Sequence, residues 1–113
     1  MSAPVDGILL RVFVLERTRH KGALVHEWLL EQAKAMGVSG GAAFREIAGF
    51  GRHSRLHDEL FFELAGDQPV EVMFAMSEEE ADRFLALLKA EKLSLFYIKS
   101  RAEFGRIGEP SAS

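Results

Sequence analysis

The fold of this chain is decided by the stretch "PVEVMFAMSEEEADRFLALLKAEKLSLFYIK", residues 69–99. One face of its first eight residues carries only apolar side chains, namely Val70, Val72, Phe74 and Met76. Alternation with a period of two is typical of a β-strand that has one buried face. The stretch therefore begins with a predicted strand over Pro69–Met76.

A helix is predicted directly after this strand. Ser77 and Glu80 have the spacing of a capping box, in which each side chain accepts a hydrogen bond from the backbone N–H of the other residue. The apolar residues that follow recur at intervals of three and four: Ala81, Phe84, Leu85 and Leu88. This spacing predicts a helix to about Glu91, and "LSLFYIK", Leu93–Lys99, predicts the last strand.

The N-terminal half of the chain has the same order of strand, helix and strand. "ILLRVFVL", Ile8–Leu15, is rich in β-branched and aromatic residues and predicts the first strand. Gly22–Met36 has apolar residues at helical spacing and predicts a helix that ends before Gly37, a residue suited to a C-cap. Ala42–Phe50 predicts the second strand.

The predicted order is therefore β-α-β, a long connection, and β-α-β. A short extra strand is predicted within that connection, over Glu59–Leu64. This order is typical of the α+β class and of the ferredoxin-like βαββαβ fold, an antiparallel sheet with both helices on one face. With 113 residues we expect one domain over 1–113, with its core over about 7–100 and a flexible C-terminal tail.

The composition excludes several classes of function. The chain has no cysteine, so disulfides, zinc–thiolate sites and thiol catalysis are excluded. Its net charge of −3 argues against a nucleic-acid partner, because phosphate binding needs a broad basic surface. No apolar run approaches the roughly 20 residues that span a bilayer, and no secretion signal is recognisable. We therefore expect a cytoplasmic protein.

The first and last predicted strands are apolar on both faces. In Ile8–Leu15 every side chain except that of Arg11 is apolar. A sheet with one face in water alternates apolar with polar residues, and monomers rarely leave large apolar patches exposed. We therefore expect the sheet face without helices to be buried by self-association.

Antiparallel topology gathers three junctions at one end of the sheet: the turn into the first helix, the connection after the second strand and the exit from the second helix. Seven of the fourteen Lys and Arg residues fall there: Arg17, Arg19, Lys21, Arg52, Arg55, Lys89 and Lys92. Arg19 and Lys21 are predicted to flank the start of the first helix, where the dipole disfavours cations and a bound anion would reverse that preference. The alternative is a solvated charged end, balanced by the carboxylates of Glu16, Asp58, Glu59 and Glu91.

"GFGRHSRLH", residues 49–57, follows at the end of the second strand. Together with "AKAMGVSGGAAFREI", residues 33–47, it resembles the PII-like signalling superfamily, most closely the uncharacterised branch (a domain of unknown function) with a G-F-G-x-x-S-x-x-H loop. The matching positions are Gly49, Phe50, Gly51, Ser54 and His57. The resemblance implies a homotrimer of ferredoxin-like subunits and a mobile loop that docks partner proteins, such as a membrane transporter or an enzyme.

The resemblance also implies a small anionic effector, typically an adenine nucleotide, bound between subunits at the base of this loop. The residues that the resemblance and the charge pattern assign to the ligand are Arg19, Lys21, Gly49, Phe50, Gly51, Arg52, His53, Arg55, His57, Lys89, Lys92 and Arg101. Arg101 is included, with Arg106, because "RAEFGRIGE", residues 101–109, is loosely similar to a C-terminal segment that contacts phosphates in PII proteins. One departure is "LKAEKLSLF", residues 88–96, which has no glycine where PII proteins have a glycine-rich turn that cradles phosphates.

An enzyme is not expected, and no cofactor is required. His53 and Ser54 are sequence neighbours, which seldom have the geometry of a base and its nucleophile. A metal-binding trimer of the copper-tolerance type is the alternative function, with His53 and His57 as metal ligands. The main expectation is a regulatory protein in which the ligand shifts the loop over about residues 50–68 between mobile and ordered states.

Overall fold

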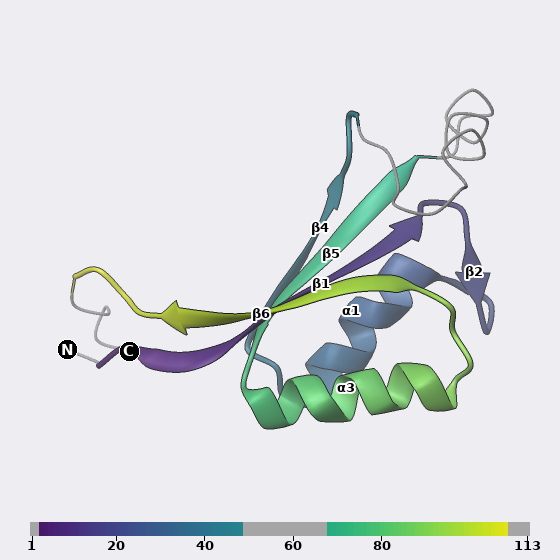
Figure 1. The fold of residues 1–113 in the computed structure, drawn as a ribbon. Coiled ribbons are helices and arrows are strands. Elements are labelled where there is room, and N and C mark those ends of the chain that lie inside the picture. The colour runs from purple at the N-terminus through teal and green to yellow at the C-terminus, as the bar shows by residue number, and fades with distance from the viewer. Residues whose placement is uncertain (1–2, 49–67, 109–113) are drawn as a thin grey trace.

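The computed structural model describes residues 3–48 and 68–108. Its elements in chain order are β1 Val5–Leu15, β2 Arg19–His20, β3 Ala23–Leu24, α1 Val25–Ala35, β4 Gly40–Arg45, β5 Pro69–Met76, α3 Glu78–Ala90 and β6 Phe96–Phe104. Four strands form an antiparallel sheet in the order β4-β5-β1-β6, and β2 pairs with β3 in a separate hairpin. Both helices lie on the same face of this sheet (Figure 1). This arrangement confirms the predicted ferredoxin-like fold.

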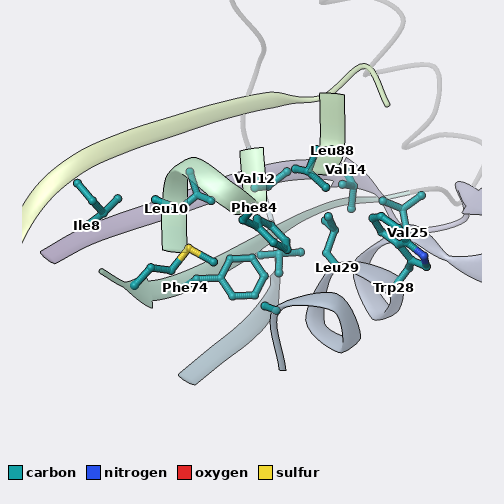
Figure 2. Packing of buried hydrophobic residues seen from close by; sticks show 14 of the residues in the cluster. Ile8, Leu10, Val12, Val14, Val25, Trp28, Leu29, Phe74, Phe84 and Leu88 are labelled. Carbon is teal, nitrogen blue, oxygen red and sulfur yellow. The ribbon is translucent and has the colours of Figure 1, made fainter. Parts of the chain in front are cut away.

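The core lies between the sheet and the two helices (Figure 2). The central strands β1 and β5 alternate buried with partly exposed side chains, as a strand with one covered face does. The buried residues are Ile8, Leu10, Val12, Val14, Val25, Trp28, Leu29, Ala33, Val70, Val72, Phe74, Met76, Ala81, Phe84 and Leu88. Phe74 of β5 and Phe84 of α3 meet edge to face with ring centroids 5.1 Å apart, which fixes α3 against the sheet.

α3 begins where the sequence predicts. The hydroxyl oxygen of Ser77 accepts a hydrogen bond from the backbone N–H of Glu80 at 3.0 Å, and the carboxylate of Glu80 accepts one from the backbone N–H of Ser77 at 2.9 Å. Both halves of the capping box are therefore formed. Glu78, Glu79 and Glu80 lie in the first turn, where the helix dipole favours carboxylates.

The predicted start of the first helix was wrong. α1 begins at Val25 rather than at Gly22, because Arg19–Leu24 forms the β2–β3 hairpin. The backbone N–H of Val25 donates to the carbonyl of Thr18 at 2.9 Å and closes this hairpin against the helix. Arg19 and Lys21 therefore lie in a hairpin, in which Arg19 pairs with Leu24, the N-cap of α1, and Lys21 lies in the turn.

The strand boundaries also differ from the predicted ones. β4 spans Gly40–Arg45 instead of Ala42–Phe50, and the predicted short strand over Glu59–Leu64 lies outside the described residues. β6 spans Phe96–Phe104 instead of Leu93–Lys99.

The shift of β6 changes the interpretation of the C-terminal tail. β1 starts at Val5, and its pairs from Val5 with Phe104 to Gly7 with Ala102 continue beyond the end of β5. This two-stranded ribbon extends from the sheet toward the two chain ends (Figure 1). The residues up to Phe104 are therefore strand, so regular structure continues a few residues beyond the expected end of the core at about residue 100. Among the described residues, no helix has the length and hydropathy to cross a membrane.

Candidate functional site

One end of the sheet collects the junctions that the sequence predicts there. Leu15 at the end of β1 pairs with Pro69 at the start of β5, and Phe13 pairs with Phe96 at the start of β6. β4 is antiparallel to β5, so it ends at the same place. We call this end the loop pole, because the connection from β4 to β5 leaves and re-enters the sheet there. The three glutamates of the first turn of α3 lie at the opposite pole.

The β2–β3 hairpin has a turn of two residues at the loop pole. His20 pairs with Ala23, and the turn residues Lys21 and Gly22 have φ angles of 52° and 83°. Positive φ at both positions is what a type I′ turn requires. Gly22 adopts this conformation freely, whereas Lys21 adopts it at a cost in backbone strain.

A single carboxylate fastens this hairpin to the end of α3. Oε1 of Glu91 lies 2.8 Å from Nε2 of His20 and 2.9 Å from Nζ of Lys21. The hydrogen bond from His20 and then that from Lys21 hold the pKa of Glu91 below its ordinary value. The ring of His20 also meets that of Trp28 edge to face, with centroids 4.8 Å apart, so the hairpin packs on α1 as well.

The two helices end in the same backbone motif with different residues. After α1, Gly37 has φ 91°, and the N–H of Val38 donates to the carbonyl of Ala33 at 3.1 Å. After α3, Lys92 has φ 60°, and the N–H of Leu93 donates to the carbonyl of Leu88 at 3.2 Å. Glycine is the usual residue at this left-handed position, so a lysine there bears a conformational cost that α1 avoids.

Three cations of the loop pole have no carboxylate partner among residues 3–48 and 68–108. A guanidinium nitrogen of Arg19 donates to the carbonyl of Gly22 at 3.1 Å, and neither Lys89 nor Lys92 forms an ion pair with a described residue. Glu16 pairs with Arg45, and this bond holds the pKa of Glu16 below its ordinary value. The charge-balanced alternative therefore applies to Lys21, whereas Asp58 and Glu59, two of the carboxylates it invokes, lie outside the described residues.

An apolar groove of about 420 Å³ lies beside Lys89, between α3 and β6. Its apolar lining comes from Val12, Leu85, Ala86, Leu88, Leu93, Leu95 and the ring of Tyr97. Lys89 is part of the same lining, so a cationic residue adjoins the apolar surface. This combination suits a ligand that joins a ring or acyl group to an anion.

The structure does not bring all the predicted ligand residues together. Arg101 pairs with Ile8 near the opposite pole, and its guanidinium lies 3.8 Å from Glu78. Arg101 is therefore remote from Lys89 and Lys92 within one chain. Seven predicted residues lie outside the described residues: Gly49, Phe50, Gly51, Arg52, His53, Arg55 and His57. No group of three or more His, Asp or Glu that could hold a metal occurs in the parts of the chain that the structure describes.

Sequence reasoning did not identify the contacts that two residues make at this site. His20 carries no pattern that would link it to Glu91, from which it is 71 positions distant. Alternation alone assigns Tyr97 to a strand face, and its place beside Lys89 depends on where β6 begins. Both assignments require the three-dimensional arrangement.

Comparison with solved structures supports the fold. A protein of Thermus thermophilus, described as a PII-like signaling protein, superimposes with a TM-score of 0.60 at 16% identity over 91% of this chain and 93% of its own. CPII of Thiomonas intermedia K12, a nitrogen regulatory PII-like protein bound to ADP, AMP and bicarbonate, superimposes with a TM-score of 0.58 at 21% identity over 93% of this chain and 99% of its own.

Comparison of sequences identifies the family. The UPF0166 protein of Aquifex aeolicus strain VF5 is 34% identical over 91 residues, which are 80% of this chain and 87% of that relative. Residues 7–95 match the family DUF190, described as Uncharacterized ACR, COG1993. This match covers more than half of the chain, so the chain belongs to the DUF190 family.

Proposed function

We propose that this protein is a homotrimeric regulator that binds a small anionic effector, an adenine nucleotide, at the loop pole between its copies. Occupancy of the site shifts the connection between β4 and β5, about residues 50–68, between two states that a partner protein distinguishes. The role is regulatory and not catalytic.

The observation that carries this proposal is the backbone of Lys21 and Lys92. Both lysines lie at the loop pole and adopt left-handed φ angles, 52° and 60°. Lys21 forms an ion pair with Glu91, and Lys92 follows Glu91 in the chain. A glycine at either position would remove the strain, and α1 ends with a glycine at the equivalent position, Gly37. Strained backbone residues cluster at active sites and ligand sites, where the surrounding structure holds them in place.

The groove beside Lys89 provides the proposed site with a surface for the ring of the ligand, next to cations for its phosphates. Its apolar lining suits a flat ring, and the ammonium groups of Lys89 and Lys92, which have no ion-pair partner among the described residues, suit phosphates. An adenine nucleotide combines these two parts. CPII, which shares the fold, binds ADP and AMP, and this supports the same ligand class here.

In the proposed trimer, the copies of the chain associate through the sheet face that carries no helix. Phe44 and Phe96 point to this face and are 49% and 44% exposed. The ring of Phe13 lies 5.5 Å from that of Phe96, so the aromatic surface continues across two strands. Other copies of the chain would cover this surface and bring their poles together.

Calorimetry with ADP, AMP and inorganic phosphate tests the effector site. Arg19→Ala and Lys92→Ala should each weaken ADP binding about tenfold, because a hydrogen bond to a charged group contributes about 1.5–3 kcal/mol. Lys34→Ala is the matched control, since Lys34 lies in the last turn of α1 at the opposite pole. Absence of ADP binding at millimolar concentration, or equal losses in Lys34→Ala, would contradict the proposal.

Light scattering tests the assembly separately. Wild type should have about three times the 12.6 kDa mass of the chain. Phe13→Glu should dissociate it, because burying an unpaired charge costs several kcal/mol. Ala35→Glu, on the exposed side of α1, should leave the mass unchanged. A monomeric wild type would refute the trimer.

A further inference from the structure

The helix-free face of the sheet contains one pair of charges in an apolar surface. The side chains that the strand registers direct to this face include Leu9, Phe13, Leu15, Ala42, Phe44, Met73, Ala75, Phe96 and Ile98. Among the described residues of the four strands, Arg11 and Glu71 are the charged ones on this face. They lie on the two central strands, in the middle of the surface.

The pair is bidentate within one chain. Nε of Arg11 donates to Oε2 of Glu71 at 2.8 Å, and Nη2 donates to Oε1 at 3.2 Å. The bond to Glu71 raises the pKa of Arg11, and the charge of Glu46, just beyond the end of β4, adds to this effect. The guanidinium also lies 5.6 Å from the centre of the Phe13 ring. The side chain of Arg11 remains 36% exposed and that of Glu71 18%, so part of each side chain is open to whatever covers the face.

An apolar cover would strip water from the remaining donors and oxygens of this pair and leave them without partners, which is unfavourable. The favoured cover is an apolar surface that carries a carboxylate and a guanidinium of its own at the same spacing. A second copy of this chain has these properties, since its helix-free face presents the same two charges. The chain is thus electrostatically complementary to itself.

We propose that Arg11 and Glu71 also pair between copies of the chain, and that this pairing makes the helix-free face select its own copies over other apolar surfaces. The inference rests on the proposed assembly through that face. It assigns to the two residues a role in partner specificity that is separate from ligand binding.

A charge swap tests this role with folded proteins. Arg11→Glu combined with Glu71→Arg preserves the pair within a chain and between swapped chains, so the swapped protein should assemble with itself. Between a swapped and a wild-type chain, like charges would face each other. Co-expression with isotope-labelled wild type, followed by native mass spectrometry, should therefore show mixed assemblies depleted about tenfold relative to random association.

A second swap provides the matched control. Lys99 and Asp82 form an ion pair at 3.2 Å between β6 and α3, away from the helix-free face. Lys99→Asp combined with Asp82→Lys should mix with wild type at random. Two outcomes would overturn the inference: random mixing of the Arg11 and Glu71 swap with wild type, or failure of the folded swap variant to assemble with itself. Neither outcome would contradict the proposed trimer of the wild-type chain. A monomeric wild type would instead overturn the assembly on which the inference rests.

Discussion

His20 and Glu91 are 71 positions apart in the chain, yet Nε2 of His20 lies 2.8 Å from Oε1 of Glu91. This contact joins the β2–β3 hairpin to the C-terminal end of α3. Lys21 binds the same carboxylate, so one acidic group holds two residues of the hairpin. The loop pole therefore has a fixed internal contact next to the cations that the proposed ligand would use.

Acid should weaken this contact through Glu91. Its pKa is lowered in the folded protein by the bonds from His20 and Lys21, so the unfolded chain binds the proton more readily. The stabilisation is present above the ordinary pKa of a glutamate and is lost as the pH falls through the lowered value. We expect the urea midpoint of wild type to exceed that of Glu91→Gln at neutral pH and to approach it near pH 3.

The fluorescence of Trp28 reports the same event, because it is the only tryptophan and contacts His20. The emission of wild type should change over this acid range, and that of Glu91→Gln should not. A constant difference in urea midpoint between the two proteins across the range would show that Glu91 does not act through its charge.

Two adjacent glycines of β4 should respond differently to alanine. A Cβ atom at Gly41 would lie 2.7 Å from Cδ1 of Phe74 and 3.3 Å from Cδ2 of Leu30, whereas one at Gly40 would meet open space. Phe74 is buried and in ring contact with Phe84, so it has little room to move. Gly41→Ala should lower the free energy of unfolding by about 1–3 kcal/mol.

Gly40→Ala is the internal control, since it makes the same chemical change one position away. It should change the free energy of unfolding by less than about 0.5 kcal/mol. Equal effects of the two substitutions in urea titrations would show that the close approach of Phe74 to β4 does not constrain Gly41.

The capping box of α3 should be worth a measurable part of the stability. Ser77→Ala removes the oxygen that accepts from the N–H of Glu80, which should cost about 1 kcal/mol of unfolding free energy. Ser39→Ala, at an exposed serine before β4, should have little effect. Thermal unfolding of both variants distinguishes the cap from a general loss of a hydroxyl; equal shifts would argue against the cap.

The sequence predicts the parts of this fold that have a clear period. The predicted and observed bounds of β5 and α3 agree within a residue, because alternation and the capping box are local signals. The β2–β3 hairpin has strands of two residues, which are too short to show a period. Its turn is Lys-Gly, whereas Asn-Gly and Asp-Gly are the usual signals of a type I′ turn.

The site could be predicted only in outline. Antiparallel topology predicts the turn before the first helix, Lys89 and Lys92 at one pole, and the strand registers confirm that grouping. The pairing of His20 and Lys21 with Glu91 depends on side-chain geometry between distant segments. The remote position of Arg101 follows from the register of β6, which a pattern of apolar residues does not fix.

Lys92 allows the conformational cost and the proposed binding role to be separated in one residue. Lys92→Gly removes a side chain from a left-handed backbone position, so the free energy of unfolding should rise by about 1 kcal/mol. The same substitution removes an ammonium group from the loop pole, so ADP should bind about tenfold more weakly. Lys92→Ala removes the charge and keeps the strain, so it should weaken binding without the gain in stability. Unfolding in urea and calorimetry with ADP measure the two effects independently. A Lys92→Gly protein that is more stable and binds ADP as wild type does would assign Lys92 to the helix end alone and remove it from the effector site.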